Sequence, residues 1–380
     1  MFRPAAQSLA VLLVVSLAPI QAVAASWTTE KERAAKGRIQ GFVQPEPVGH
    51  GVPAMSVAVT INGEVVYSSG LGDARPGVPA GPHTRYRIGS ITKQFTAAAM
   101  LRLIETGATV PTEGRPLALD TPLDRVLEGA NNWAVEGQRR ITIRHLLNMN
   151  SNLPNFTRRP PENSNPWGSV RASELLGALK SLKPSGWPNS FEYSNTNYFL
   201  LAEVVQAVAS AHRGRRVDYA HLLHDLVLDR AGLRETETFT AVGSDAGLAE
   251  PHYRRKPAFA DADWLKGSGD LVSTVADLAR WNGALVSGRV ISRTSLDAMF
   301  GDGARVAPRE YYGMGWFIER VEDWDRYTHS GSVPGYTSFN ALAHQSSSGN
   351  WLGVTLLTNS DGVVGLDDLA ADLLYLASTD

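Results

Sequence analysis

A serine and a lysine in this chain have the spacing that nucleophilic catalysis requires. Ser90 and Lys93 are three residues apart, directly before the strongly helix-forming segment 96–104, so we expect both side chains on one helical face, one turn from each other. A serine hydroxyl becomes a nucleophile when a base takes its proton, and a lysine whose ammonium form is disfavoured can be that base. Ser90 could equally be only the N-cap of this helix, because S-x-x-K is a short motif. The catalytic interpretation therefore depends on partners elsewhere in the chain.

The segment Tyr193-Ser194-Asn195 offers such partners, just before an apolar helical run at 199–209. Tyr193 and Asn195 are two residues apart, so in an extended loop both side chains project to the same side. A phenol can accept or relay a proton, and a carboxamide can donate to a substrate carbonyl while it accepts from a lysine. The alternative is an aromatic loop residue followed by a Ser or Asn helix cap.

A third segment, 327–336, contains His329 and Gly331. Its β-branched residues followed by Gly and Pro predict a strand that ends in a turn. A glycine on a strand edge has no side chain to obstruct an approaching substrate backbone, so we expect Gly331 to line the substrate site. A lone histidine is more often structural than catalytic, so this segment carries little weight by itself.

Together, the three motifs form a pattern that resembles a known family. The order S-x-x-K, Y-x-N and H-x-G is similar to that of the penicillin-recognising serine hydrolases, which include class C β-lactamases, D-Ala-D-Ala carboxypeptidases, D-aminopeptidases and related esterases. Three further blocks agree with family patterns: Thr142–Leu147 with T-I-R-H-L-L, Gly269–Trp281 with G-L-V-S-T-A-x-D-L-A-R-W, and Tyr312–Trp316 with Y-G-x-G-W. The resemblance spans the chain from about Met55 to its end.

The resemblance implies a role for each motif residue. Ser90 would attack a carbonyl carbon to form an acyl-enzyme, and Lys93 and Tyr193 would share the proton transfers, with the choice of general base left open between them. Asn195 would orient Lys93 and bind the acyl-side amide of the substrate. The backbone N–H groups of Ser90 and Ser332 would hold the oxyanion. This chemistry needs no metal and no cofactor.

His329 is the clearest indication of substrate. Many β-lactamases and penicillin-binding proteins have lysine at this position, as a fixed cation for the substrate carboxylate, whereas carboxypeptidase-, D-aminopeptidase- and esterase-like members have histidine. At neutral pH a histidine is mostly uncharged, so it is a weaker, pH-dependent anchor. When protonated, His329 could also lower the pKa of Lys93. We therefore expect a small-molecule or peptide substrate, a D-amino-acid peptide or an ester, with two alternatives: a class C β-lactamase, or a penicillin-binding module acylated without turnover.

One departure from the family pattern lies close to the motifs. Asp270 replaces a frequent second glycine of its block and could add a negative charge near the site. If it does so, amine-bearing substrates become more plausible.

The composition is that of an exported globular enzyme. Arg3, an apolar core at 9–18 and the pattern Ala22-Val23-Ala24 predict a signal peptide over residues 1–24 and a periplasmic or extracellular location. The apolar stretch is too short for a membrane span, so no stable span should remain after cleavage. The chain has no cysteine and a formal net charge of −2, which exclude a disulfide framework or cysteine nucleophile and give no indication of a nucleic-acid partner.

The order of predicted elements indicates a single domain of mixed α/β class over residues 25–380, which the resemblance implies is a serine hydrolase domain. A hairpin with an Asn62-Gly63 turn follows Met55, and four strand-like runs at 316–321, 326–330, 336–344 and 351–358 precede a final helix at about 366–377. The resemblance implies an antiparallel sheet flanked by helices, built from about 25–85 and 290–380, with an inserted, mostly helical region at about 86–289, as in the β-lactamase and penicillin-binding transpeptidase fold.

Overall fold

The computed structural model describes residues 27–44, 51–127, 140–158, 172–179, 184, 190–242, 247–253, 263–301 and 303–379. The predicted signal peptide, residues 1–24, lies outside the described residues. No helix in the described ranges is long and apolar enough to cross a membrane.

The centre of the molecule is an antiparallel sheet of nine strands in the order β3-β2-β1-β12-β11-β10-β9-β8-β7. Strand β1 at the start of the chain pairs with β12 near its end, with Met55 opposite Thr358. The sequence predicted the hairpin and the four late strands, and the structure confirms them. The strands are β1 (Ala54–Ile61), β2 (Glu64–Arg75), β3 (Val78–Pro79), β7 (Ala304–Ala307), β8 (Glu310–Tyr312), β9 (Phe317–Val321), β10 (Trp324–Val333), β11 (Tyr336–Gln345) and β12 (Trp351–Thr358).

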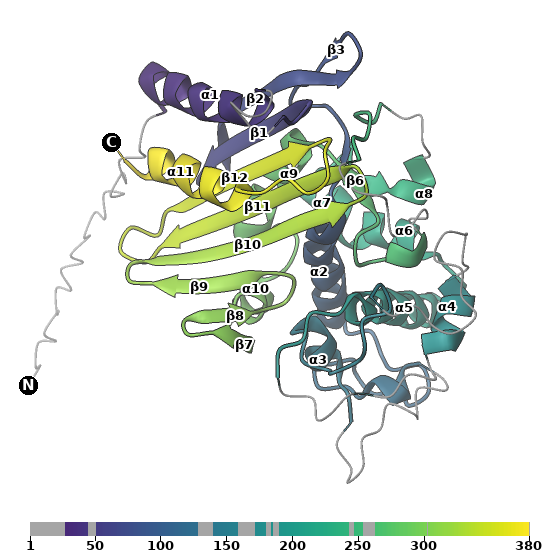
Figure 1. Cartoon of the computed structure of the whole chain (residues 1–380). Helices are drawn as coiled ribbons and strands as arrows, with labels where there is room; N and C mark the ends of the chain where they lie inside the picture. The colour runs from purple at the N-terminus through teal and green to yellow at the C-terminus, as the bar shows by residue number, and fades with distance from the viewer. Residues whose placement is uncertain are drawn as a thin grey trace, which may run out of the picture.

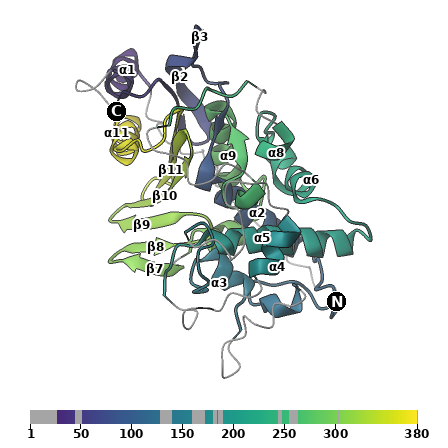
Figure 2. The ribbon, with the colours of Figure 1, turned by 45° about the vertical axis from the view of Figure 1, so that its right-hand side comes forward.

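Helices cover both faces of this sheet, which is why all eight residues of β1 are buried. Helices α1 (Thr29–Val43) and α11 (Leu366–Ser378) lie on one face, and α9 (Val275–Val286) lies on the other (Figure 2). Each face has its own apolar core, and the larger core continues into the helical region. The predicted final helix is thus confirmed as α11.

The helical region lies beside the lower strands of the sheet, with α2 passing between the two parts (Figure 1). It lies between β3 and β7 in the sequence, as expected from the order of elements. Its helices are α2 (Thr92–Glu105), α3 (Ile143–Leu147), α4 (Ala172–Leu179), α5 (Asn195–His212), α6 (Tyr219–Leu223), α7 (Asp229–Ala231), α8 (Phe239–Val242) and α10 (Arg293–Met299), with short helical turns η1 (Gly89–Ile91), η2 (Leu123–Arg125), η4 (His224–Leu228) and η5 (Asp263–Leu265).

A second, three-stranded sheet leads into the segment that carries Ser90. It consists of β4 (Tyr86–Arg87), β6 (Leu271–Ser273) and β5 (Glu237–Thr238) in the order β4-β6-β5. Because η1 and α2 follow β4 directly, the small sheet fixes where the predicted nucleophile enters its helix.

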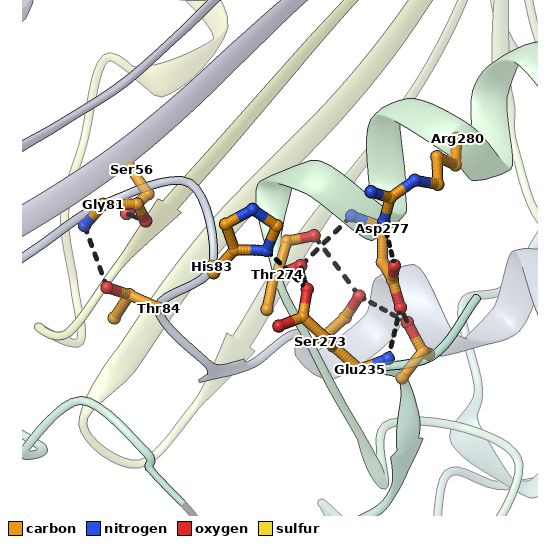
Figure 3. A network of polar contacts seen from close by, with 10 residues as sticks. Ser56, Gly81, His83, Thr84, Glu235, Ser273, Thr274, Asp277 and Arg280 are labelled. Atoms are coloured by element: carbon orange, nitrogen blue, oxygen red, sulfur yellow. Dashed lines mark hydrogen bonds and ion pairs between the residues drawn. The ribbon is translucent and has the colours of Figure 1, made fainter.

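A polar network links the start of β5 in this small sheet to helix α9 (Figure 3). The fully buried Asp277 of α9 accepts hydrogen bonds from the Glu235 amide at 2.7 Å and the Thr236 hydroxyl at 2.9 Å, and pairs with Arg280 at 2.8 Å. Thr274 caps α9 by accepting from the Asp277 amide at 3.1 Å. The T-x-x-D spacing within the Gly269–Trp281 block is therefore a helix cap, and its aspartate also anchors the small sheet.

Candidate active site

Ser90 lies in the helical turn η1, one turn before the start of α2. Gly89 precedes it with a φ of 50°, in the left-handed region that glycine adopts without strain. The alternative in which Ser90 is the N-cap is wrong, because the N-cap of α2 is Ile91 and no side chain caps it. The Ser90 hydroxyl is instead within hydrogen-bond distance of Lys93 Nζ, at 2.8 Å.

Lys93 is fully buried, and its Nζ atom contacts three oxygen atoms. These are Ser90 Oγ at 2.8 Å, Asn195 Oδ1 at 2.8 Å and the Ser268 carbonyl oxygen at 2.6 Å. The amide oxygen and the carbonyl can only accept, so they orient two N–H bonds of the amine. In the neutral amine, the remaining lone pair then points at the serine hydroxyl, which is the geometry of a general base.

Burial also favours the neutral form of that amine. Removal from water holds the pKa of Lys93 well below its usual range, while the nearby carboxyl of Asp270 opposes this shift. A deprotonated lysine can take the proton of Ser90.

Asn195 is held in place by an asparagine turn that the sequence motifs did not include. Its Nδ2 donates to Thr157 Oγ1 at 2.9 Å, and its backbone N–H donates to Asn155 Oδ1 at 3.2 Å. Asn155 Oδ1 also accepts from the hydroxyl of Thr157 at 2.9 Å. These contacts fix which end of the Asn195 amide faces Lys93, so this residue orients the base as the resemblance implied.

Tyr193 completes the group around the serine. Its ring centroid lies 5.0 Å from Lys93 Nζ, within the range of a cation–π contact. Burial raises the pKa of the Tyr193 phenol, and a side-chain hydrogen bond with Ser90 opposes this shift. The phenol therefore stays protonated at neutral pH and can donate a proton, which distinguishes it from Lys93.

His329 belongs to the site, but it is not a cation. Burial lowers its pKa to about 3, and the charge of Lys93 acts in the same direction. Its Nδ1 donates to the Ser330 carbonyl oxygen at 2.6 Å, so its Nε2 accepts from the Tyr312 hydroxyl at 3.2 Å. The expectation that a protonated His329 could anchor a carboxylate or lower the pKa of Lys93 is therefore wrong, since the ring stays neutral at physiological pH.

Aromatic rings surround His329 on the side that faces Tyr193. The His329 ring centroid lies 6.1 Å from that of Tyr193 and 5.5 Å from that of Phe317. Phe191 and Tyr312 extend this group, with ring centroids 5.6 Å apart. Among the described residues, the side of the site next to Tyr193 and His329 is therefore mainly aromatic, with Lys93 as the nearest amine.

Gly331 is needed for a reason other than the expected one. A Cβ at this position would lie 2.0 Å from the Ile88 carbonyl oxygen and 2.2 Å from Ser338 Oγ. Ser338 lies opposite Gly331 in the ladder, and its hydroxyl donates to Ile88 O at 2.8 Å. The missing side chain therefore lets strand β10 approach the segment before Ser90.

This close approach brings the two predicted oxyanion donors together. Strand β9 pairs with β10 only as far as Thr328, and η1 packs against the stretch beyond it. A Cβ on Gly89 would lie 2.8 Å from the Ser332 nitrogen. The amide of Ser332 is thus next to the Gly89–Ser90 backbone, where two N–H groups can converge on one oxygen atom.

Asp270 lies in the interior and not in the substrate space. It is 5 % exposed, and its Oδ1 accepts from the Gly267 amide at 3.0 Å. Burial raises its pKa to about 7, so it is partly protonated at neutral pH. The carboxyl is close enough to act on Lys93, as expected of an acidic residue near the site. Because it is buried, it does not support the expectation of amine-bearing substrates.

As with Asn155 and Thr157, the sequence motifs assigned no site role to Ser268, Tyr312 or Ser338. Ser268 directly precedes the Gly269–Trp281 block, and Tyr312 opens the Y-G-x-G-W block, so both lie in or beside segments that carried the resemblance. A backbone carbonyl such as that of Ser268 has no signature in a side-chain motif. Ser338 has none either, because only the β10–β11 register places it beside Gly331.

Comparison with known proteins gives a match over almost the whole chain. A family model described as Beta-lactamase matches residues 35–378. Penicillin-binding protein 4* of Bacillus subtilis is 25% identical over 311 residues, which cover 74% of this chain and 64% of the relative. Putative beta-lactamase-like 1 of Homo sapiens is 31% identical over 252 residues, which cover 63% of this chain and 47% of that protein. The chain thus spans less than two thirds of the length of these relatives.

Solved structures share the fold. The octameric penicillin-binding protein homologue from Pyrococcus abyssi superimposes with a TM-score of 0.72 and 24% identity, over 91% of this chain and 76% of the other. The D-amino acid amidase from Ochrobactrum anthropi, complexed with L-phenylalanine, also gives a TM-score of 0.72, with 22% identity over 91% of this chain and 98% of the other. The observed architecture is therefore the β-lactamase and penicillin-binding protein fold.

Proposed function

Because the chain belongs to the beta-lactamase family, we propose that it is a serine hydrolase that cleaves amide or ester bonds through an acyl-enzyme on Ser90. The observation that carries this proposal is the coordination of Lys93 Nζ by Ser90 Oγ, Asn195 Oδ1 and the Ser268 carbonyl, all within 2.8 Å. Two of these oxygens can only accept, so the third is placed to give up its proton.

The acylation step follows from this geometry. Lys93 takes the proton of Ser90 as Oγ attacks the carbonyl carbon, and the carbonyl oxygen becomes an oxyanion between the amides of Ser90 and Ser332. The intermediate collapses when the bond to the leaving group breaks. The leaving nitrogen or oxygen takes a proton from the Tyr193 phenol, and the phenolate recovers one from the neighbouring Lys93 ammonium.

Deacylation uses the same groups in the reverse sense. A water molecule takes the place of the leaving group, loses a proton to the Lys93–Tyr193 pair and attacks the acyl carbon. The bond to Ser90 Oγ then breaks, the acid product leaves, and the serine recovers its proton. The opposite shifts of the two pKa values favour Lys93 as the base of acylation and Tyr193 as the proton donor.

The neutral His329 supports a particular substrate class. The leaving group must lie beside Tyr193, which protonates it, and that end of the site is aromatic and uncharged. Esters and D-amino-acid peptides or amides with uncharged leaving groups fit this end better than β-lactams, whose carboxylate needs a cation. We also propose that the enzyme is exported, on the evidence of the N-terminal sequence pattern.

A second function is supported by the names of relatives. Several are called penicillin-binding proteins, and a protein of this fold could be acylated by a β-lactam and then not turn over. The presence of a complete proton-transfer pair supports turnover.

One experiment separates these functions. The protein is incubated with p-nitrophenyl esters, D-Ala-D-Ala peptides, D-amino-acid amides and a chromogenic cephalosporin. Ser90→Ala is the test variant, and Ser348→Ala, on an exposed turn far along the chain, is the matched control. Turnover that is lost only in Ser90→Ala supports the hydrolase, stoichiometric labelling without turnover supports the binding module, and turnover that survives in Ser90→Ala refutes both.

A further inference from the structure

A pocket lined by two arginines lies just beyond the C-terminal end of β10, the strand that carries the Ser332 amide. Its volume is about 370 Å³, within the usual range for small-molecule sites. Its charged lining residues are Arg75, Arg87 and Glu250, and its apolar walls include Phe239, Tyr336 and Pro334. Figure 1 shows the neighbourhood, where the β10–β11 turn approaches β6 and α8.

The two guanidinium groups are held by their surroundings. The Arg87 guanidinium carbon lies 4.4 Å from the ring centroid of Phe239, and Arg75 Nε donates to the Leu248 carbonyl at 2.7 Å. Burial raises the pKa of Tyr336, and both arginines oppose this shift, so their fields overlap at that phenol. Within the described part of the chain, Arg75 forms no ion pair with a carboxylate. Among the described lining residues, Arg75, Arg87 and Glu250 together give a formal net charge of +1.

The chain connects this pocket directly to the reacting atoms. Arg87 is three residues before Ser90, and Pro334 is two residues after Ser332. At no more than about 3.6 Å per residue, both pocket residues lie within roughly 11 Å of an oxyanion amide. A short acyl chain and an arginine side chain can span that distance.

The position of the proton donor determines which part of the substrate extends towards the pocket. The leaving group lies at the Tyr193–His329 end, because that end supplies its proton. The acyl part must then extend the other way along β10, past Ser332 towards Pro334. We propose that the Arg75–Arg87 pocket binds an anionic group, such as a carboxylate, on the acyl part of the substrate.

This inference rests on the proposed hydrolase function and deepens it. Position 329, where lysine would hold a carboxylate on the leaving-group side, carries a neutral histidine, and the positive charge of the site lies on the acyl side instead. The enzyme should therefore select substrates by an acidic acyl chain. Planar guanidinium groups suit a carboxylate, because each can donate two parallel hydrogen bonds.

The kinetic test compares two esters that differ only in charge: p-nitrophenyl hydrogen adipate and p-nitrophenyl hexanoate. Both have six-carbon acyl chains, and Ser90→Ala provides the rate of spontaneous hydrolysis. We expect wild type to prefer the adipate ester, and Arg75→Gln and Arg87→Gln each to lower the ratio of kcat/KM values about tenfold, mainly through the adipate ester. Arg305→Gln, on the exposed strand β7, should leave the ratio unchanged.

A binding measurement tests the anionic pocket even if the protein does not hydrolyse the two esters. Adipic acid monoamide is titrated by calorimetry into Ser90→Ala, alone and combined with Arg75→Gln or Arg87→Gln, and the melting temperature of each variant checks folding. Weaker binding by about tenfold in folded arginine variants supports the pocket. Absence of turnover of every ester, peptide and amide substrate by wild type refutes the proposed function alone. Equal rates for both esters, or equal binding in all folded variants, refute the anionic pocket.

Discussion

Replacement of Gly331 by alanine tests how strand β10 positions the site. The new Cβ would lie 2.0 Å from Ile88 O and 2.2 Å from Ser338 Oγ, whereas non-bonded heavy atoms normally stay about 3.5 Å apart. Ile88 O is a backbone atom, so no rotamer change relieves the contact. The strand and the Ser90 segment must therefore separate by roughly 1 to 1.5 Å.

This separation has a cost in both stability and rate. The Ser338–Ile88 hydrogen bond, 2.8 Å long, breaks at a cost of about 1 kcal/mol, and overpacking adds about 1–3 kcal/mol. A shift of this size also moves the Ser332 amide out of hydrogen-bond range of an oxyanion next to Ser90. Loss of one such donor costs about 10²–10³-fold in kcat. We expect kcat to fall by that factor and the free energy of unfolding by about 2–4 kcal/mol.

The assay combines ester hydrolysis with urea denaturation. Gly37→Ala is the matched control, because Gly37 lies in α1 with no atom within 4 Å of a new Cβ, so it should retain full activity and gain slightly in stability. Ser338→Ala removes the hydrogen bond without a clash and should lose less than Gly331→Ala in both measurements. If Gly331→Ala keeps kcat within about threefold of wild type, the proposed convergence of the two amides is wrong.

Three further changes test other parts of the structure. Asp270 has a pKa of about 7 in the folded protein and about 3.9 in the unfolded chain, so folding is stabilised below about pH 4 and this stabilisation is lost as the pH rises to 7. Relative to wild type, the free energy of unfolding of Asp270→Asn should therefore increase by roughly 4 kcal/mol between pH 4 and pH 8 in urea denaturation. A difference that does not change with pH would contradict the buried carboxyl. The same variant removes the charge that opposes the low pKa of Lys93, so the acidic limb of its kcat/KM profile should move to lower pH, whereas a shift to higher pH would exclude Lys93 as the base. His329→Lys adds a cation beside Tyr193 and should raise the kcat/KM ratio of carboxylated to uncharged leaving groups about tenfold, and an unchanged ratio across ester, D-peptide and β-lactam substrates would refute this role. Asp277→Ala leaves the Glu235 amide, the Thr236 hydroxyl and Arg280 without their acceptor, so it should lower the free energy of unfolding by about 3 kcal/mol in urea denaturation. Asp277→Asn should fall between wild type and this variant. Equal stability of all three proteins would show that the network in Figure 3 does not anchor the small sheet.

The local elements followed from the sequence because their signals are local. The Asn62-Gly63 turn, with both residues at positive φ, joins β1 and β2 as expected, and alternating or apolar runs predicted β9 to β12 to within a few residues. Ser90 and Lys93 are likewise one helical turn apart, so their contact depends only on local backbone geometry. The capping interpretation of Ser90 was wrong because the helical turn η1 precedes α2 and shifts the helix start.

The protonation states needed the folded chain, because burial is a property of the whole molecule. Residue 329 is a histidine in any conformation, but its pKa falls to about 3 only inside its shell of aromatic rings and beside Lys93. The sequence indicated that Asp270 could add a negative charge near the site, but only the fold shows that its carboxyl is buried. Neither outcome can be inferred from spacing, since the groups that desolvate each residue come from distant segments.

The sequence by itself determined the chemistry of the site: a serine, a lysine, a tyrosine and an asparagine in three motifs, in an order that resembles one family. Only the tertiary structure decided how they work together. The β10–β11 register places Ser338 over Gly331, and that contact brings the Ser332 amide beside Ser90. Ser90 and Ser332 are more than two hundred positions apart in the chain, and their convergence depends on backbone contacts that no side-chain motif encodes.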